Sequence, residues 1–140
     1  MVPRGGVKLG ALSESQRANL GKLLGELLSE DGVENITYQL AAEDLLISGD
    51  LFGVMKYGSE YFYAAFLGEP STTEPWMFQF GGHHLAINAT VFGPNVSFSP
   101  MLTGGQPLHL RLDGDDIFIT QRETAAAQAF MDSLTDEQTE

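Results

Sequence analysis

Three histidines carry most of the chemistry that this sequence could perform. Two are adjacent, His83 and His84, and the third is His109. Imidazole binds transition metals and transfers protons near neutral pH, so a histidine-based metal or small-ligand site is the first hypothesis. The chain has no cysteine, which excludes thiolate zinc sites, iron–sulfur clusters and thiol catalysis. Any metal ligand must therefore be His, Asp, Glu or a backbone oxygen.

The adjacency of the two histidines argues against a simple chelate. Neighbouring side chains on a regular strand point to opposite faces, so His83 and His84 cannot both reach one metal unless Gly81-Gly82 bends the chain. Alternation places His84 with Asn88 on one face of its strand. If this face meets that of the strand carrying His109, a divalent transition metal could be bound; its candidate ligands are His83, His84, His109 and Asp113. Otherwise we expect His83 to be a hydrogen-bonded residue at the rim of the core and His84 a surface residue.

An aromatic run supplies the other candidate binding surface. Trp76, Phe78 and Phe80 alternate along one predicted strand, and the Trp76 ring could stack on a sugar or an extended ligand. The alternative is that the three rings belong to the core, because alternating aromatic residues are what a sheet buries. The residues predicted to contact a small ligand are Trp76, His84 and Asn88.

The remaining polar motifs predict no specific reaction. Glu43-Asp44 and Asp115-Asp116 lack the spacing of a calcium loop, so we expect a solvated helix face and a turn, respectively. The sequence shows no phosphate-binding loop and no nucleophile elbow. Catalytic residues, and whether the protein is an enzyme, are left open.

Composition limits the partners. The chain has 140 residues, with 19 acidic and 7 basic side chains and a net charge of −12. Phosphate backbones and anionic membranes would be repelled, so nucleic acid is excluded as a partner. No apolar stretch approaches the roughly 20 residues of a membrane span, and no signal peptide opens the chain. We expect a soluble protein, with its compartment left open.

Helical periodicity predicts helices near both ends of the chain. Ser13 and Gln16 predict a capping box for a helix over residues 14–29, with a leucine stripe; its members are Leu20, Leu23, Leu24, Leu27 and Leu28. Asp31-Gly32 is expected to end that helix, and a weaker helix is predicted over residues 36–47. A C-terminal helix is predicted from a capping box at Thr120, running through Leu134 and packing against one face of a sheet.

The middle of the chain reads as strands joined by short turns. Extended patterns are predicted at residues 61–67, 76–80, 84–92, 96–99, 108–113 and 117–119. The first of these is apolar on both faces and is expected to be a covered central strand. A short turn at Gly93-Pro94-Asn95 is expected to place Val91 beside Phe98. The fold class is therefore α+β: a mostly antiparallel sheet of five or six strands, with N-terminal helices and a C-terminal helix.

One domain is predicted over residues 7–140. Residues 1–6 look like a tag-cleavage remnant or a disordered start. A helix-capping pattern at Thr135–Gln138 has no predicted helix behind it, and on that basis we expect the domain to be a fragment of a longer one.

Four motifs in fixed order resemble the domain-of-unknown-function 3500 family, a largely microbial group. The motifs are Tyr57-Gly58-Ser59, Gly68-Glu69-Pro70-Ser71, Pro75-Trp76 and Gly82-His83-His84-Leu85 with the alternating strand that follows. Met77-Phe78 stands where many relatives carry Gly-Trp. Family members look longer, with a further histidine-rich segment and an Arg-Asp pair. The resemblance implies that His83 or His84 would be half of any histidine site, and it supplies no mechanism.

Two functions follow as hypotheses. The first is a domain that binds a metal or a small ligand through its histidines and has enzymatic potential. The second is a non-catalytic module that binds a partner or a copy of itself through a sheet face or strand edge, and it predicts a homo-oligomer.

Overall fold

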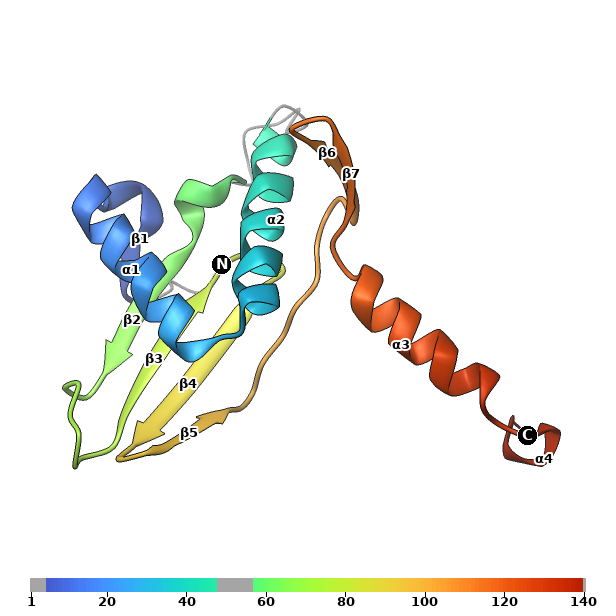
Figure 1. Ribbon diagram of the computed structural model, residues 1–140. Coiled ribbons are helices and arrows are strands. Elements are labelled where there is room, and N and C mark those ends of the chain that lie inside the picture. The colour runs from blue at the N-terminus through green and yellow to red at the C-terminus, as the bar shows by residue number, and fades with distance from the viewer. Residues whose placement is uncertain (1–4, 48–56, 140) are drawn as a thin grey trace.

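The computed structural model describes residues 5–47 and 57–139, and it has the predicted α+β architecture. Two helices lie across one face of an antiparallel sheet, and a C-terminal helix extends away from this body (Figure 1). Residues 1–4 of the predicted remnant lie outside the described residues. Among the described residues, no helix combines the length and hydropathy of a bilayer-spanning segment.

The N-terminal helices form where the leucine stripe predicts, with one error of boundary. Helix α1 spans Glu14–Leu27, and both hydrogen bonds of the capping box between Ser13 and Gln16 are present. Helix α2 spans Glu30–Leu46, so it begins six residues before the predicted start. Asp31-Gly32 does not end a helix; it lies in the first turn of α2, because the Ser29 side chain accepts from the Gly32 N–H and caps the new helix.

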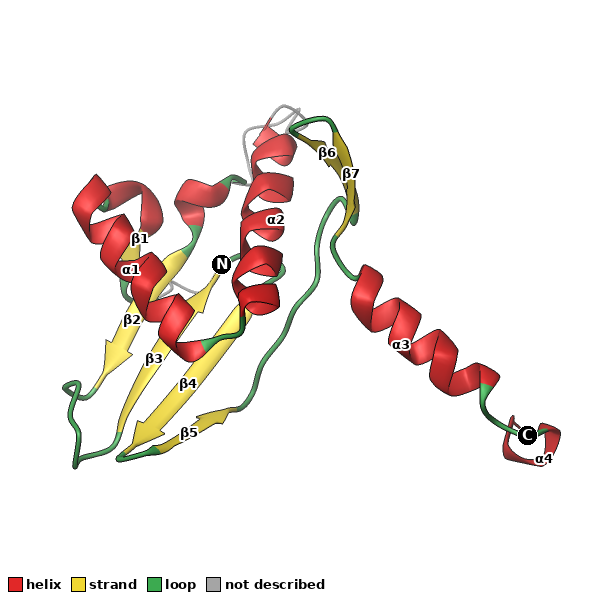
Figure 2. Cartoon of the chain, viewed as in Figure 1, coloured by secondary structure: helices red, strands yellow, loops and turns green. Residues whose placement is uncertain are grey.

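Five strands form the main sheet in the order β1-β2-β3-β4-β5, with all neighbours antiparallel (Figure 2). Their bounds are β1 Val7–Lys8, β2 Tyr63–Leu67, β3 Trp76–Gly81, β4 Ala86–Phe92 and β5 Asn95–Phe98. The sequence did not predict β1, which is only two residues long. The short 3-10 helices η1, Leu9–Ala11, and η3, Ser59–Tyr61, follow β1 and precede β2.

The core lies between this sheet and the two helices. It includes Leu24 of α1, Ile36 of α2, and Phe78 and Phe80 of β3, all less than a tenth exposed. The leucine stripe packs against the same cluster. Among the described residues, no helix covers the opposite face of the sheet (Figure 1), where side chains such as Gln79 and Asn88 are half-buried and Phe92 is exposed.

Two predictions about the strands are wrong. Strand β2 is not covered on both faces: only Ala64 is buried, and Phe66 and Leu67 are about half exposed. Strand β5 pairs two residues out of the predicted register, with Val91 opposite Val96, because the turn is only Gly93-Pro94. A shift of two residues keeps every side chain on its predicted face.

The last two strands form a separate hairpin instead of extending the main sheet. Strands β6, His109–Leu112, and β7, Asp115–Phe118, pair only with each other. Leu110 and Ile119 pack this hairpin against Ala42 of α2 in a second, small core. The main sheet therefore has five strands, and His109 does not lie in it.

The predicted C-terminal helix exists but does not pack. Helix α3 spans Gln121–Asp132, with α4, Asp136–Thr139, behind it. None of the residues of α3 is buried, and Phe130 is 64% exposed. The expectation that it covers a sheet face is wrong. Thr120 is the N-cap of α3, but its side chain makes no capping hydrogen bond, so only the position of that capping box was predicted.

Candidate functional site

The adjacent histidines occupy a tight turn between β3 and β4. Gly81 pairs with Ala86, and the Gly82 N–H donates to the Leu85 carbonyl at 2.9 Å, which leaves His83 and His84 as the two residues at the corner. The prediction that strand β4 begins at His84 is wrong by two residues. The turn also removes the strand alternation that would have separated the rings, whose centroids are 4.0 Å apart.

Gly82 is needed here for packing. A Cβ atom added to it would lie 2.4 Å from the Phe62 ring, and Phe62 is only 1% exposed. Any side chain at position 82 would push the turn off the core.

His83 is held by a buried carboxylate. Its Nδ1 lies 2.8 Å from Oε1 of Glu43, and the two side chains are 31% and 5% exposed. Because a carboxylate oxygen accepts, Nδ1 carries the proton, and in the neutral imidazole Nε2 is left with its lone pair. Among the described residues, no hydrogen bond to Nε2 is formed.

Glu43 was placed incorrectly by the sequence reasoning, which expected a solvated helix face. It lies on α2 seven residues after Ile36 and three after Leu40, so helical spacing puts it on the apolar stripe that faces the core. That spacing was the available signal. A buried acidic residue needs a partner, and His83 supplies it.

His84 has a different partner. Its Nε2 donates to Oε1 of Gln106 at 3.1 Å, which joins the turn to the segment that leads into the second hairpin. The Tyr57 ring packs against the His83 ring in a tilted arrangement, with centroids 5.2 Å apart and an interplanar angle of 49°. The two histidines therefore have fixed rings but separate hydrogen-bond partners.

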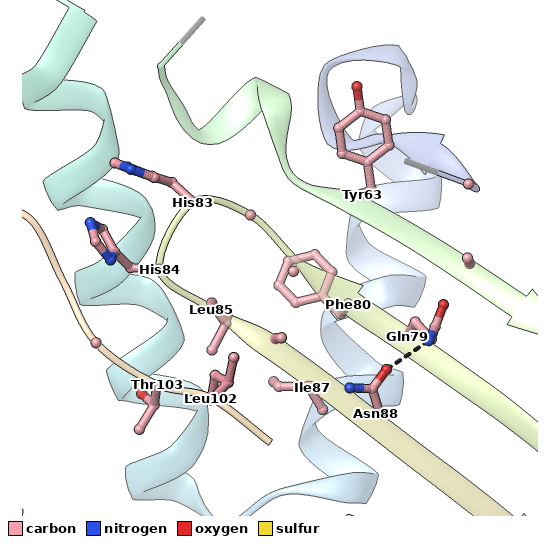
Figure 3. Close-up of a pocket in the computed structure, with 16 residues that line it drawn as sticks. Tyr63, Gln79, Phe80, His83, His84, Leu85, Ile87, Asn88, Leu102 and Thr103 are labelled. Carbon is pink, nitrogen blue, oxygen red and sulfur yellow. Dashed lines mark hydrogen bonds between the residues drawn. The ribbon is translucent and has the colours of Figure 1, made fainter. Parts of the chain in front are cut away.

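The turn opens onto a pocket of about 640 Å³ (Figure 3). His83 and His84 lie at one end of it beside α2, and Gln79 and Asn88 lie at the other on β3 and β4. Between them the lining is mostly small or apolar: Ala65, Gly81, Ala86, Leu85, Ile87 and Leu102. The structure thus brings together three of the predicted site residues: His83, His84 and Asn88.

The other predicted site residues lie elsewhere. Trp76 starts β3, at the end of the strand away from the turn; its indole N–H donates to the Ser71 carbonyl at 3.0 Å, and its ring packs on the core. His109 contacts Asp116 at 3.0 Å and stacks on Phe118. Asp113 has a φ of 52° in the Asp113-Gly114 turn of the second hairpin, a position that Asp tolerates better than most residues. None of these three lines the pocket.

The metal ligands proposed from sequence are not gathered. Within the part of the chain that the structure describes, no three His, Asp or Glu side chains are placed to share a metal ion. Whether His83 and His84 bind a metal stays a prediction.

The shifted pKa values belong to another cluster, at the base of α3. A hydrogen bond from Arg122 lowers the pKa of Glu34, and their 2.7 Å contact raises that of Arg122. A hydrogen bond to Glu34 raises the pKa of Tyr38. These side chains are at the surface and line a separate cavity of about 180 Å³. They attach α3 to α2 and take no part in the histidine pocket.

Comparison with known proteins gives a family and no activity. No curated protein and no solved structure matches the chain. One family model, described as a protein of unknown function (DUF3500), matches residues 1–140, which is the whole chain. This confirms the resemblance carried by the Pro75-Trp76 and Gly82–Leu85 motifs. The chain therefore belongs to the DUF3500 family.

Proposed function

We propose that the domain binds a small, uncharged, hydroxyl-bearing molecule in the pocket beside the β3–β4 turn. His83 accepts a hydrogen bond from the ligand through Nε2, and Glu43 fixes the ring for that task. The observation that carries the proposal is the 2.8 Å contact between a buried Glu43 and a partly exposed His83. A carboxylate behind an imidazole is the arrangement that proteins use to orient a base or a ligand-binding nitrogen.

The lining favours a neutral ligand. None of the 16 residues around the pocket is Lys, Arg, Asp or Glu, so a carboxylate or phosphate on the ligand would find no fixed opposite charge. The net charge of −12 further opposes anions. A volume of about 640 Å³ lies within the usual range for small-molecule sites, and polar groups at opposite ends of the pocket (Figure 3) favour an elongated ligand.

The same geometry is suited to general base catalysis. A ligand hydroxyl at Nε2 of His83 would transfer its proton to the ring, and Glu43 would stabilise the resulting imidazolium through Nδ1–H. His84, with its Nε2 proton committed to Gln106, is not equivalent. If the domain is an enzyme, His83 is its base.

The test uses maltose as an elongated neutral probe and citrate as an anionic one, followed by the backbone amide shifts of the isotopically labelled protein. His83→Asn keeps an N–H near the position of Nδ1 for Glu43 but has no group at Nε2. We expect maltose to shift the amides around residues 81–88 and 102–104, and His83→Asn to abolish this. His109→Gln, at a histidine outside the pocket, should leave it intact. Absence of any shift with maltose, or preferential binding of citrate, would refute the proposal.

A metal in place of the ligand gives a different result. If zinc occupied the turn, added Zn²⁺ would raise the melting temperature of the wild type but not of His83→Asn, because binding to the native state stabilises it. If the pocket binds a neutral ligand and no metal, added Zn²⁺ should change the melting temperatures of the wild type and of His83→Asn by the same amount.

Self-association is the second candidate, and α3 supports it. Phe130 and Met131 are 64% and 51% exposed on a helix with no buried residue. Helices of about 12 residues are marginal in water without packing. A second copy covering α3 would supply that packing. Light scattering should then show a dimer that Phe130→Glu dissociates and His83→Asn does not; a monomer at all concentrations removes this candidate.

A further inference from the structure

The far end of the pocket contains a directed chain of hydrogen bonds. Nδ2 of Asn88 donates to the Pro100 carbonyl at 2.6 Å, and Nε2 of Gln79 donates to Oδ1 of Asn88 at 2.7 Å. Both amides come from facing positions of β3 and β4, since Gln79 and Asn88 are register partners.

The direction of this chain is fixed by its last member. A carbonyl oxygen can only accept, so Asn88 must present its NH₂ group to Pro100 and its oxygen to Gln79. Gln79 must then present its own NH₂ group to Asn88. As a result, Oε1 of Gln79 is directed away from Asn88, as Figure 3 shows, and no hydrogen bond to it is formed among the described residues.

We propose that Gln79 is the specificity-determining acceptor of this pocket: its Oε1, oriented by Asn88 and Pro100, binds a second hydroxyl of the ligand whose first hydroxyl is bound by His83. This inference rests on the proposed function and refines it. Two acceptors at opposite ends of one pocket select a molecule with hydroxyl donors at both of its ends. The two acceptors disfavour a molecule that presents only acceptors at its ends. Each buried acceptor would then lose its water without gaining a hydrogen bond, which costs free energy.

Asn88 is the positioning residue in this scheme. It lines the pocket, and because its oxygen accepts from Gln79 while one N–H of its Nδ2 donates to Pro100, it sets the orientation of Gln79. The Pro100 carbonyl belongs to the segment that pairs with β4 only through the bridge between Ala86 and Leu102. Movement of that segment would release the orientation of Gln79.

The variants separate an acceptor role from a merely structural one. Gln79→Met removes the acceptor at nearly constant size. Maltose affinity should fall about threefold to tenfold in Gln79→Met, the effect of one neutral hydrogen bond. Asn88→Ala should weaken binding about threefold, because Gln79 loses the group that orients it.

Thr90→Val is the matched control, because Thr90 lies two residues along β4 on the same face and does not line the pocket. It should bind maltose like the wild type. If the wild type binds maltose and His83→Asn does not, while Gln79→Met binds normally, the Gln79 inference is overturned and the proposed function stands. Equal weakening in Gln79→Met and Thr90→Val also overturns it. Failure of the wild type to bind maltose overturns both.

Discussion

Two β-hairpins of this chain, β3–β4 and β6–β7, each place a histidine beside a carboxylate, but they surround the pair differently. At the β3–β4 turn, the His83 and Glu43 side chains are 31% and 5% exposed, and the pair links the turn to α2. In the β6–β7 hairpin, His109 and Asp116 are 54% and 62% exposed and lie on the same small sheet. The distances are nearly equal, at 2.8 and 3.0 Å.

From this difference we infer that burial, more than contact distance, decides whether a histidine–carboxylate pair stabilises the fold and fixes the ring. An exposed pair is screened by water and contributes little to stability. A buried carboxylate that loses its partner is left uncompensated, which is costly. Only the β3–β4 pair should therefore fix a ring strongly enough to serve a site.

The largest effect should come from the glycine beside the buried pair. Gly82→Ala should lower the free energy of unfolding by about 3 kcal/mol, because the new Cβ overlaps the buried Phe62 ring. Gly114→Ala, in the turn of the other hairpin, meets no atom within 4 Å and should cost about 1 kcal/mol through its positive φ alone. Urea unfolding of both variants measures this. Equal costs would mean that the β3–β4 turn is not held against the core.

Removing each histidine comes next. His83→Ala should destabilise the protein by about 2 kcal/mol, since it leaves the Glu43 carboxylate buried without a donor. His109→Ala should change stability by less than about 0.5 kcal/mol. The same denaturant unfolding compares them, and a His109 effect as large as that of His83 would contradict the distinction.

A double variant isolates the buried charge. Adding Glu43→Gln to His83→Ala should recover about 1 kcal/mol, because a neutral amide is less costly to bury alone than a carboxylate. Adding Asp116→Asn to His109→Ala should recover nothing. If the changes in unfolding free energy caused by His83→Ala and Glu43→Gln are simply additive, the Glu43 carboxylate carries no desolvation penalty in the His83→Ala variant.

The smallest effect concerns the exposed cluster at the base of α3. The pKa of Glu34 is lowered by Arg122, so this contact stabilises the fold above the ordinary value of 4.5 and is lost as the pH falls below it. In Arg122→Met, the Glu34 pKa should rise towards 4.5, with little change in stability near neutral pH. Titration of the Glu34 carboxyl carbon by NMR follows the shift; an unchanged midpoint would exclude the Arg122 contact in solution.

Local patterns predicted the elements of this fold well. The capping box at Ser13 and the alternation of Phe78 and Phe80 depend on neighbouring residues only, and both are present. The start of α2 was missed because Asp31-Gly32 resembles a helix end, although Ser29 is a regular N-cap. The packing of α3 could not be derived, since an amphipathic pattern does not specify which surface covers it.

The site was only partly predictable, for a similar reason. Three residues that the sequence named as candidates, His83, His84 and Asn88, line the pocket, but the partners of His83 and His84 lie 40 and 22 residues away. Contacts between residues so far apart in the sequence leave no local spacing pattern that could predict them. Glu43 could have been suspected from its place on the apolar stripe, whereas Gln79 appears as an ordinary polar strand residue until Pro100 is seen to orient its amide.

The central claim is that Glu43 holds His83 with its proton on Nδ1, and the ring nitrogens report this directly. A long-range ¹H–¹⁵N NMR spectrum, recorded at a pH where the imidazoles are neutral, distinguishes the two tautomers. We predict Nδ1–H for His83, and Nε2–H for His84 and His109, whose contacts to Gln106 and Asp116 use that nitrogen. A His83 ring protonated at Nε2 would contradict the account, because the nitrogen assigned to the ligand would then carry a proton.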